Sequence, residues 1–233
     1  MSEQAFTTVI TGANRGIGFE LSAQYLAEGW QVYACCRQPE AASKLQTLSA
    51  NPALRLCQLD VTDWASVKGL AIHLASTPVD ILINNAGLFG GDRQSFGNLD
   101  YDRWLQVLDV NTLGPYRVST ALADSVARST HRTIVNLSSS MASIQDYSSG
   151  GGYIYRSSKT ALNMVTVNLA HDLKPRGITV LAVDPGWVRT DMGGPNAELD
   201  PEQSATGIRA VLEQSSVATS ERFVSWENKT HPW

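Results

Sequence analysis

The chain has 233 residues, of which 43% are hydrophobic and 17% charged, and its formal net charge is -4. This length and apolar content suit one large domain, so we expect residues 1–233 to form a single domain. No basic stripe accompanies the small negative charge, so nucleic acid is not an expected partner. No window approaches the roughly 18 consecutive apolar residues that a membrane span needs, so no membrane partner is expected either.

The cysteines and histidines predict no metal site. Cys35, Cys36 and Cys57 are odd in number and lack metal-ligand spacing, and the four histidines are scattered. The beginning of the sequence enters a strand-like run at once, without the pattern of a signal peptide. We therefore expect reduced, buried thiols in a cytoplasmic protein.

Short apolar runs rich in β-branched residues alternate with segments of helical periodicity. The predicted strands are 6–11, 31–36, 54–59, 79–84, 132–138, 178–183 and 222–226. The predicted helices are 16–28, 40–49, 64–75, 101–127, 154–174 and 202–213. This alternation predicts an α/β fold with one doubly wound, parallel, seven-stranded sheet of the Rossmann type and helices on both faces. Right-handed crossovers would then bring the carboxyl ends of the strands to one edge, where ligands bind.

A glycine-rich turn follows the first predicted strand, in "TGANRGIGFEL". Gly12, Gly16 and Gly18 would let the backbone turn tightly and approach a pyrophosphate, and the next helix would offer its free N–H groups. The turn follows a strand and opens a helix, which is the context that favours dinucleotide binding over a purely structural turn.

The second predicted strand ends with Cys36 and Arg37, where NAD-binding sites usually carry an acid for the ribose 2′-hydroxyl. Arg15 lies in the glycine turn. Two guanidinium groups near the ribose would attract a 2′-phosphate, so the expected cofactor is NADP(H) rather than NAD(H). The competing interpretation is that both arginines are solvated surface residues.

The stretch "GGGYIYRSSK" at 150–159 places Lys159 four residues after Tyr155. On a helix this spacing puts both side chains on one face. A phenol has a pKa of about 10, and a neighbouring cation favours the phenolate, so we expect Lys159 to lower the pKa of Tyr155. Neither Tyr147 nor Tyr153 has such a lysine.

Motifs along nearly the whole chain resemble the short-chain dehydrogenase/reductase family. They are TGxxxGxG at 11–18, "NNAG" at 84–87, a serine after the fifth strand, Y-x-x-x-K at 155–159 and "DPGWVRT" at 184–190. Within that family, "PGWVRTDMGGP" and "ERFVSWENKTHPW" look most like the carbonyl reductase and C-factor-like branch.

The resemblance implies a cofactor site. Asp60 and Val61 would contact the adenine, Asn84 and Ala86 would line the ribose, and the loop at 185–190 would hold the nicotinamide carboxamide. The implied cofactor-binding residues are Gly12, Asn14, Arg15, Gly16, Ile17, Gly18, Arg37, Asp60, Val61, Asn84, Ala86, Gly87, Tyr155, Lys159, Pro185, Gly186, Val188 and Thr190.

The resemblance also implies a catalytic set of Ser139, Tyr155, Lys159 and Asn111. Alignment with the family pattern selects Ser139 from three successive serines, with Ser140 as the alternative. Ser139 would donate a hydrogen bond to the substrate carbonyl, Tyr155 would supply the proton and the nicotinamide the hydride. Our own hypothesis is that Pro115, which has no N–H, kinks the helix and frees the Asn111 carbonyl to hold a proton-relaying water.

The expected substrate is a small uncharged aldehyde or ketone, or an alcohol in the reverse direction, bound beside a loop at 187–204. Trp187, Met192 and Tyr147 are the apolar candidates for its pocket. The segment between Ser139 and Tyr155 either forms one wall of the entrance or is a surface loop without a role.

Two questions of function and assembly stay open at this point. The alternative function is an NADP(H)-binding regulatory or signalling protein with incidental turnover. The helices at 101–127 and 154–174 are the family's usual interface, which favours a homodimer or homotetramer, and a monomer is the alternative.

Overall fold

The computed structural model describes residues 5–233, so the first four residues of the expected domain lie outside the description. Its main sheet has seven strands in the order β3-β2-β1-β4-β7-β8-β9, and every pair is parallel. The strands are β1 Thr7–Thr11, β2 Gln31–Cys36, β3 Leu54–Gln58, β4 Ile81–Asn84, β7 Thr133–Leu137, β8 Thr179–Asp184 and β9 Phe223–Ser225. The doubly wound parallel sheet predicted from the sequence is therefore confirmed.

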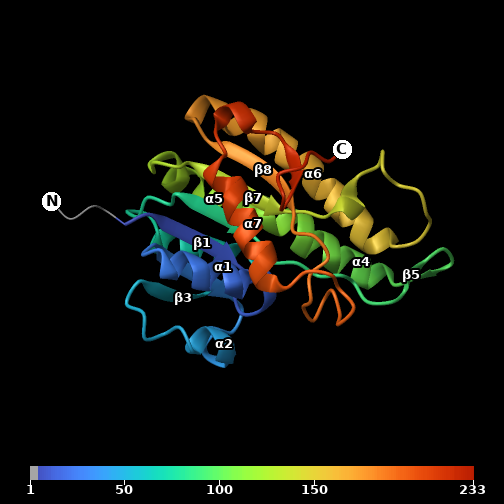
Figure 1. Cartoon of the computed structure of the whole chain (residues 1–233), viewed down its shortest axis with the longest axis horizontal. Coiled ribbons are helices and arrows are strands. Elements are labelled where there is room, and N and C mark those ends of the chain that lie inside the picture. Colours follow the sequence, from blue (N-terminus) through green and yellow to red (C-terminus); the bar gives the residue numbers. More distant parts are fainter. Residues whose placement is uncertain (1–4) are drawn as a thin grey trace.

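Helices cover both faces of this sheet (Figure 1). They are α1 Gly16–Ala27, α2 Ser43–Gln46, α3 Trp64–His73, α4 Tyr101–Leu108, α5 Gly114–Ala127, α6 Tyr153–Leu173 and α7 Pro201–Glu213. Leu21 of α1 and Ile208 of α7 belong to the core cluster on one face, whereas Leu70, Leu122 and Leu169 of α3, α5 and α6 belong to the cluster on the other. Because both faces are covered, every residue of β1 and β8 is buried, including the threonines of β1 and Asp184 at the end of β8.

The predicted helix at 101–127 is wrong in one respect, because a π-helical segment at Asp109–Leu113 separates α4 from α5. The Gly114 N–H bonds to the Asp109 carbonyl, five residues back, instead of four. Pro115 has no N–H with which to continue the regular ladder, and a widened turn accommodates that loss. The structure thus shows a π-bulge before Pro115, and the kink predicted there stays a prediction.

Two other segments also differ from the prediction. The helix predicted at 40–49 is replaced by a 3-10 turn at Pro39–Ala41 and by α2, which is only four residues long. Between β4 and α4 lies a small antiparallel hairpin of β5 Gln94–Ser95 and β6 Asn98–Leu99, which the sequence did not predict. Its strands have two residues each, too short for a periodic pattern to show.

The C-terminal segment folds back onto β9. The His231 N–H donates to the Phe223 carbonyl (2.8 Å), and the Trp233 ring stacks on that of Phe223 (centroids 5.6 Å apart). Trp226 packs between α7 and the loop after β8, against Gly207 and Gly186. This packing leaves no space for a side chain at position 207.

We predict that Gly207→Ala lowers the free energy of unfolding by about 1–3 kcal/mol, although alanine normally favours helices. A Cβ there would lie 2.5 Å from Trp226 Cε3 and 2.6 Å from the Trp226 carbonyl oxygen. The matched control is Gly69→Ala in α3, where a Cβ would have no neighbour within 4 Å. Urea unfolding should show the control gaining up to about 1 kcal/mol. Equal effects at the two positions would contradict the packing described here.

Candidate active site

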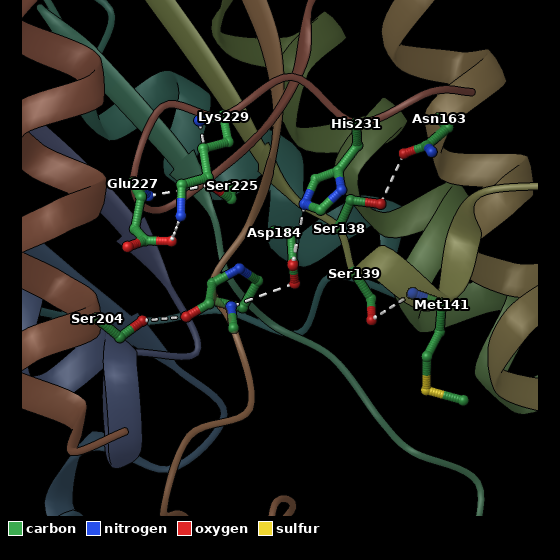
Figure 2. Close-up of polar contacts among 12 residues, drawn as sticks. Ser138, Ser139, Met141, Asn163, Asp184, Ser204, Ser225, Glu227, Lys229 and His231 are labelled. Carbon is green, nitrogen blue, oxygen red and sulfur yellow. Dashed lines mark hydrogen bonds and ion pairs between the residues drawn. The ribbon is translucent and has the colours of Figure 1, made fainter. Parts of the chain in front are cut away.

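Tyr155 lies in the first turn of α6 and is buried beneath the loop that follows β4. The Ser139 hydroxyl, two residues after the end of β7, lies close enough to the phenol to lower its pKa. Ser139 Oγ also accepts the Met141 N–H at 3.2 Å, as Figure 2 shows. A hydroxyl has one proton and two lone pairs, so Ser139 can accept this N–H and still donate one hydrogen bond.

The three successive serines point in different directions. Ser138 is buried, and its hydroxyl donates to Asn163 Oδ1 at 2.6 Å (Figure 2). Ser140 begins the 3-10 turn at Ser140–Ala142 and is exposed. The hydroxyl beside the phenol is therefore that of Ser139, the serine selected from the sequence.

Lys159 lies one helical turn after Tyr155, and its Nζ is 5.8 Å from the centroid of the Tyr155 ring. The ammonium donates a hydrogen bond to the Leu137 carbonyl at 2.6 Å, which joins α6 to β7. Burial lowers the pKa of Lys159 to about 8, and the carboxylate of Asp184 opposes that change. The predicted neighbourhood of the two side chains is thus present.

The predicted lowering of the Tyr155 pKa is wrong for this structure. Burial raises the pKa of Tyr155 to about 12; the hydrogen bond from Ser139 lowers it, and the charge of Asp184 raises it further. Lys159 contributes no resolved shift, and its ammonium is engaged with the Leu137 carbonyl. Desolvation of the phenolate therefore outweighs the effect expected from the neighbouring cation.

Asn111 lies in the π-helical segment and is fully buried. Its Oδ1 accepts the Leu88 N–H (2.8 Å), while Nδ2 donates to the Leu88 carbonyl (2.8 Å) and to Ser158 Oγ (3.0 Å). The Ser158 hydroxyl in turn donates to the Tyr155 carbonyl at 2.7 Å. The side chain thus ties the widened turn to α6, and the water relay at its carbonyl stays a prediction.

Gln94 and Phe89 are site residues that the sequence did not single out. Gln94 Oε1 accepts the Tyr155 N–H at 2.8 Å, and Nε2 donates to the carbonyls of Phe89 (3.0 Å) and Gly91 (2.7 Å). The Phe89 ring lies against that of Tyr155, with centroids 5.1 Å apart. Both belong to the segment between β4 and α4, which carries no motif that would have revealed them.

The glycine turn lies at the carboxyl end of β1, and α1 begins at Gly16. Arg15 at the N-cap makes no side-chain hydrogen bond to the first-turn N–H groups, which suits them to an anion. A cavity of about 560 Å³ opens here, lined in part by Arg15, Gly16 and Thr190. Arg15 also forms an exposed ion pair with Asp191 (Nη1–Oδ2, 2.7 Å).

A second cavity, of about 460 Å³, lies beyond the ends of β2 and β3 and is lined in part by Arg37, Asp60 and Ser66. Asp60 Oδ1 accepts hydrogen bonds from the Thr62 N–H and hydroxyl, which lower the pKa of the carboxyl group. The residues that line the two cavities include the guanidinium groups of Arg15 and Arg37, the carboxylate of Asp60 and the N-terminus of α1, all along one edge of the sheet. This donor set fits a dinucleotide with an additional phosphate.

The backbone around position 12 leaves no space for a side chain, whether or not a ligand is bound. A Cβ at Gly12 would lie 2.8 Å from the Ala86 Cα. Asn85 Nδ2 donates to the carbonyls of Thr11 (2.8 Å) and Gly12 (2.9 Å), which ties "NNAG" to the glycine turn. Asn84 instead donates to Ser119 and Asn136 inside the molecule, so its contact with a ribose stays a prediction.

The segment after β8 completes this edge. The Pro185 carbonyl accepts the Ser204 hydroxyl (2.7 Å), and the Gly186 N–H donates to Asp184 Oδ1 (3.2 Å). Val188 is buried, and the Thr190 hydroxyl oxygen accepts the Gly193 N–H at 3.1 Å. The described residues contain no group of three or more His, Cys, Asp or Glu side chains arranged for a metal ion.

The lowered pKa of Lys159 gives a prediction about stability. An ordinary lysine pKa is 10.5 and the folded value is about 8, so the unfolded chain binds more protons between these values. Stability contributed by Lys159 should therefore rise as the pH increases through that window. The free energy of unfolding should be measured in urea for the wild type and for Lys159→Met at each pH. The difference between the two values should rise with pH. A difference that is flat, or that falls, from about pH 8 to pH 10 would contradict it.

Comparison with known proteins agrees with this geometry. The family model described as short chain dehydrogenase matches residues 7–200. "C-signal" from Myxococcus xanthus is 36% identical over 167 residues, which cover 72% of this chain and 100% of that protein. The NADPH-bound carbonyl reductase from chicken fatty liver superimposes with a TM-score of 0.91 at 34% identity, covering 99% of this chain and 100% of that one. The carbonyl reductase Sniffer of D. melanogaster gives a TM-score of 0.92 at 29% identity, with the same coverage. The chain therefore belongs to the short-chain dehydrogenase family.

Proposed function

We propose that this oxidoreductase is an NADPH-dependent carbonyl reductase that converts a small uncharged aldehyde or ketone to an alcohol, or catalyses the reverse reaction. The observation that supports the proposal most is the placement of Tyr155. Its phenol lies beside Ser139, one turn before Lys159, at the sheet edge where both cavities open. The chicken protein of the same fold, a carbonyl reductase with bound NADPH, supports both the reaction and the cofactor.

Each catalytic side chain has a distinct part in this proposal. The Ser139 hydroxyl donates a hydrogen bond to the carbonyl oxygen of the substrate, which it can do while its own oxygen accepts the Met141 N–H. With a pKa of about 12, Tyr155 carries its proton at neutral pH and can donate it to the developing alkoxide. Lys159, with a pKa of about 8, is largely protonated there and restores that proton. When bound, NADPH supplies the hydride.

The cofactor would lie along the edge from the ends of β2 and β3 to the end of β8. Arg15 and Arg37 would hold the 2′-phosphate, and the first turn of α1 the pyrophosphate. Asp60 would bind at the adenosine end, and the loop from Pro185 to Thr190 at the nicotinamide end. Arg15 would then exchange its exposed partner Asp191 for a phosphate.

The substrate would enter between the loop after β8 and the segment that precedes α6. Trp187 and Met192 are 54% and 47% exposed, and Tyr147 is 43% exposed, so apolar surface is available on both sides. The Tyr147 ring is held by Arg156, whose guanidinium carbon lies 4.3 Å from the ring centroid. This contact favours the interpretation of the segment as an entrance wall over a loop without a role.

We further propose that the chain works as one domain in the cytoplasm and assembles as a homodimer or homotetramer. All three cysteines are free thiols. None of the helices in residues 5–233 combines the length and hydropathy that crossing a bilayer requires. Large apolar side chains are exposed on the proposed interface helices and the π-bulge between α4 and α5, namely Tyr101, Leu105, Leu113, Tyr116 and Met164.

A second candidate function is an NADP(H)-binding regulatory or signalling protein in which turnover is incidental. The similarity to the relative named "C-signal" favours this candidate, because the match covers all of that protein. The arrangement of Ser139, Tyr155 and Lys159 favours the first candidate.

We predict that Tyr155→Phe reduces kcat by at least about 100-fold, because the proton donor is lost while the ring is kept. NADPH affinity should remain within a few-fold of wild type. Turnover of a panel of aldehydes and ketones, followed by NADPH absorbance, checks the first value, and fluorescence titration checks the second. The matched control is Tyr153→Phe, two residues earlier in α6 and 40% exposed.

Two outcomes would count against the proposed enzyme. Full activity of the Tyr155 variant in the purified protein would remove Tyr155 from the mechanism. An inactive variant that functions normally in the cell would favour the signalling candidate, because binding would then suffice.

We predict that Arg37→Asp weakens NADPH binding by about 10- to 100-fold, since a charge-assisted contact with the 2′-phosphate is replaced by repulsion. NADH affinity should stay equal or increase. Arg55→Asp on β3 is the matched control, because Arg55 is exposed and outside both cavities. A wild-type protein that prefers NADH would refute the assignment of the 2′-phosphate site.

A further inference from the structure

Asp184 is a buried carboxylate to which neither the motifs nor the proposed mechanism assigns a role. It is the last residue of β8 and is only 7% exposed. The strand beside it is β7, where the Ser138 N–H donates to the Val183 carbonyl at 2.8 Å. Figure 2 shows Asp184 immediately next to the turn that carries Ser138 and Ser139. The carboxylate therefore lies at the same sheet edge as the proposed catalytic groups.

Both oxygens of this carboxylate have partners. Oδ1 accepts the Gly186 N–H at 3.2 Å, and Oδ2 lies 3.3 Å from His231 Nε2. The second contact is not aligned as a hydrogen bond and is a close approach of the two side chains. His231 is itself anchored by its N–H on the Phe223 carbonyl and by its ring, 4.9 Å from that of Phe223. The C-terminal segment thus holds the side chain of Asp184 in place.

Asp184 follows Val183, which pairs with Leu137 across β8 and β7, and the Leu137 carbonyl accepts the Lys159 ammonium at 2.6 Å. The buried carboxylate therefore lies near that ammonium, and its charge acts on both members of the Tyr155–Lys159 pair. It raises the pKa of the phenol, and it opposes the lowering of the Lys159 pKa that burial causes. Ser139 contributes a hydrogen bond to the phenol, and His231 faces the carboxylate from the C-terminal segment. Within residues 5–233, no other charged group produces a resolved shift in either pKa. In a buried site little water screens such a charge.

We propose that Asp184 is a positioning residue of this site, whose buried carboxylate keeps the Lys159 ammonium protonated. In the proposed mechanism the Lys159 ammonium restores the proton of Tyr155, so the carboxylate favours carbonyl reduction at neutral and mildly alkaline pH. Gly186 belongs to the proposed nicotinamide loop, so its hydrogen bond to Oδ1 also links that loop to the same side chain. The inference about reduction rests on the proposed function, whereas the effect on Lys159 does not.

The test replaces the charge while keeping the shape, with Asp184→Asn. The titration of Lys159 is followed through its 13Cε NMR signal, assigned by its loss in Lys159→Met. Its midpoint, about pH 8 in the wild type, should fall by roughly one unit when a nearby buried negative charge is removed. The alkaline limb of kcat for carbonyl reduction should move to lower pH in the same variant, because loss of the charge lowers the pKa of both groups.

The matched control is Glu227→Gln, which removes an exposed acid from the same C-terminal segment, paired with Lys229 at 2.8 Å. It should leave the Lys159 midpoint unchanged. Thermal unfolding confirms that each variant is folded, and Asp184→Ser replaces Asp184→Asn if the latter is not. A Lys159 midpoint that is unchanged in the folded Asp184 variant overturns the inference. An enzyme without NADPH-dependent turnover refutes the proposed function instead, and the NMR titration still decides the part played by Asp184.

Discussion

The hydrogen bond from the Lys159 ammonium to the Leu137 carbonyl is the interaction on which the arrangement of the site depends. It joins the first half of α6 to the end of β7, so the phenol one turn earlier on the helix is brought to the serine that follows the strand. A buried ammonium without such a partner would be costly, and here the backbone of the sheet supplies it. The same hydrogen bond therefore attaches α6 to the sheet and positions the catalytic side chains.

Three further segments hold Tyr155 and Lys159 in place from different directions. The loop after β4 contributes Gln94, which accepts the Tyr155 N–H and thereby fixes the beginning of α6. The π-helical segment contributes Asn111, which reaches α6 through Ser158. The end of β8 contributes Asp184, whose charge reaches both groups. The loop after β4 and the π-helical segment precede α6 by more than 35 residues, whereas β8 is the strand that follows it. Parallel topology brings all three to one edge of the sheet.

The electrostatics of the pair differ from the simple expectation of a cation that acidifies a phenol. Burial disfavours the charged form of each group, which is the phenolate of Tyr155 and the ammonium of Lys159. The pKa of Tyr155 therefore rises to about 12 and that of Lys159 falls to about 8. The phenol is therefore a proton donor at neutral pH, which suits the reductive direction.

The sequence by itself determined the doubly wound parallel sheet, the segments of the chain that form its seven strands and the location of the Ser139, Tyr155 and Lys159 motifs. These features are local: a strand buried on both faces reads as a continuous apolar run, and an i, i+4 pair shares a helix face wherever the helix lies. Only the tertiary structure decided the direction of the Tyr155 pKa shift and the parts played by Gln94, Phe89 and Asp184. Desolvation depends on everything packed around a group, and the contacts of these three residues join segments far apart in the chain, so no spacing or periodicity could have revealed them.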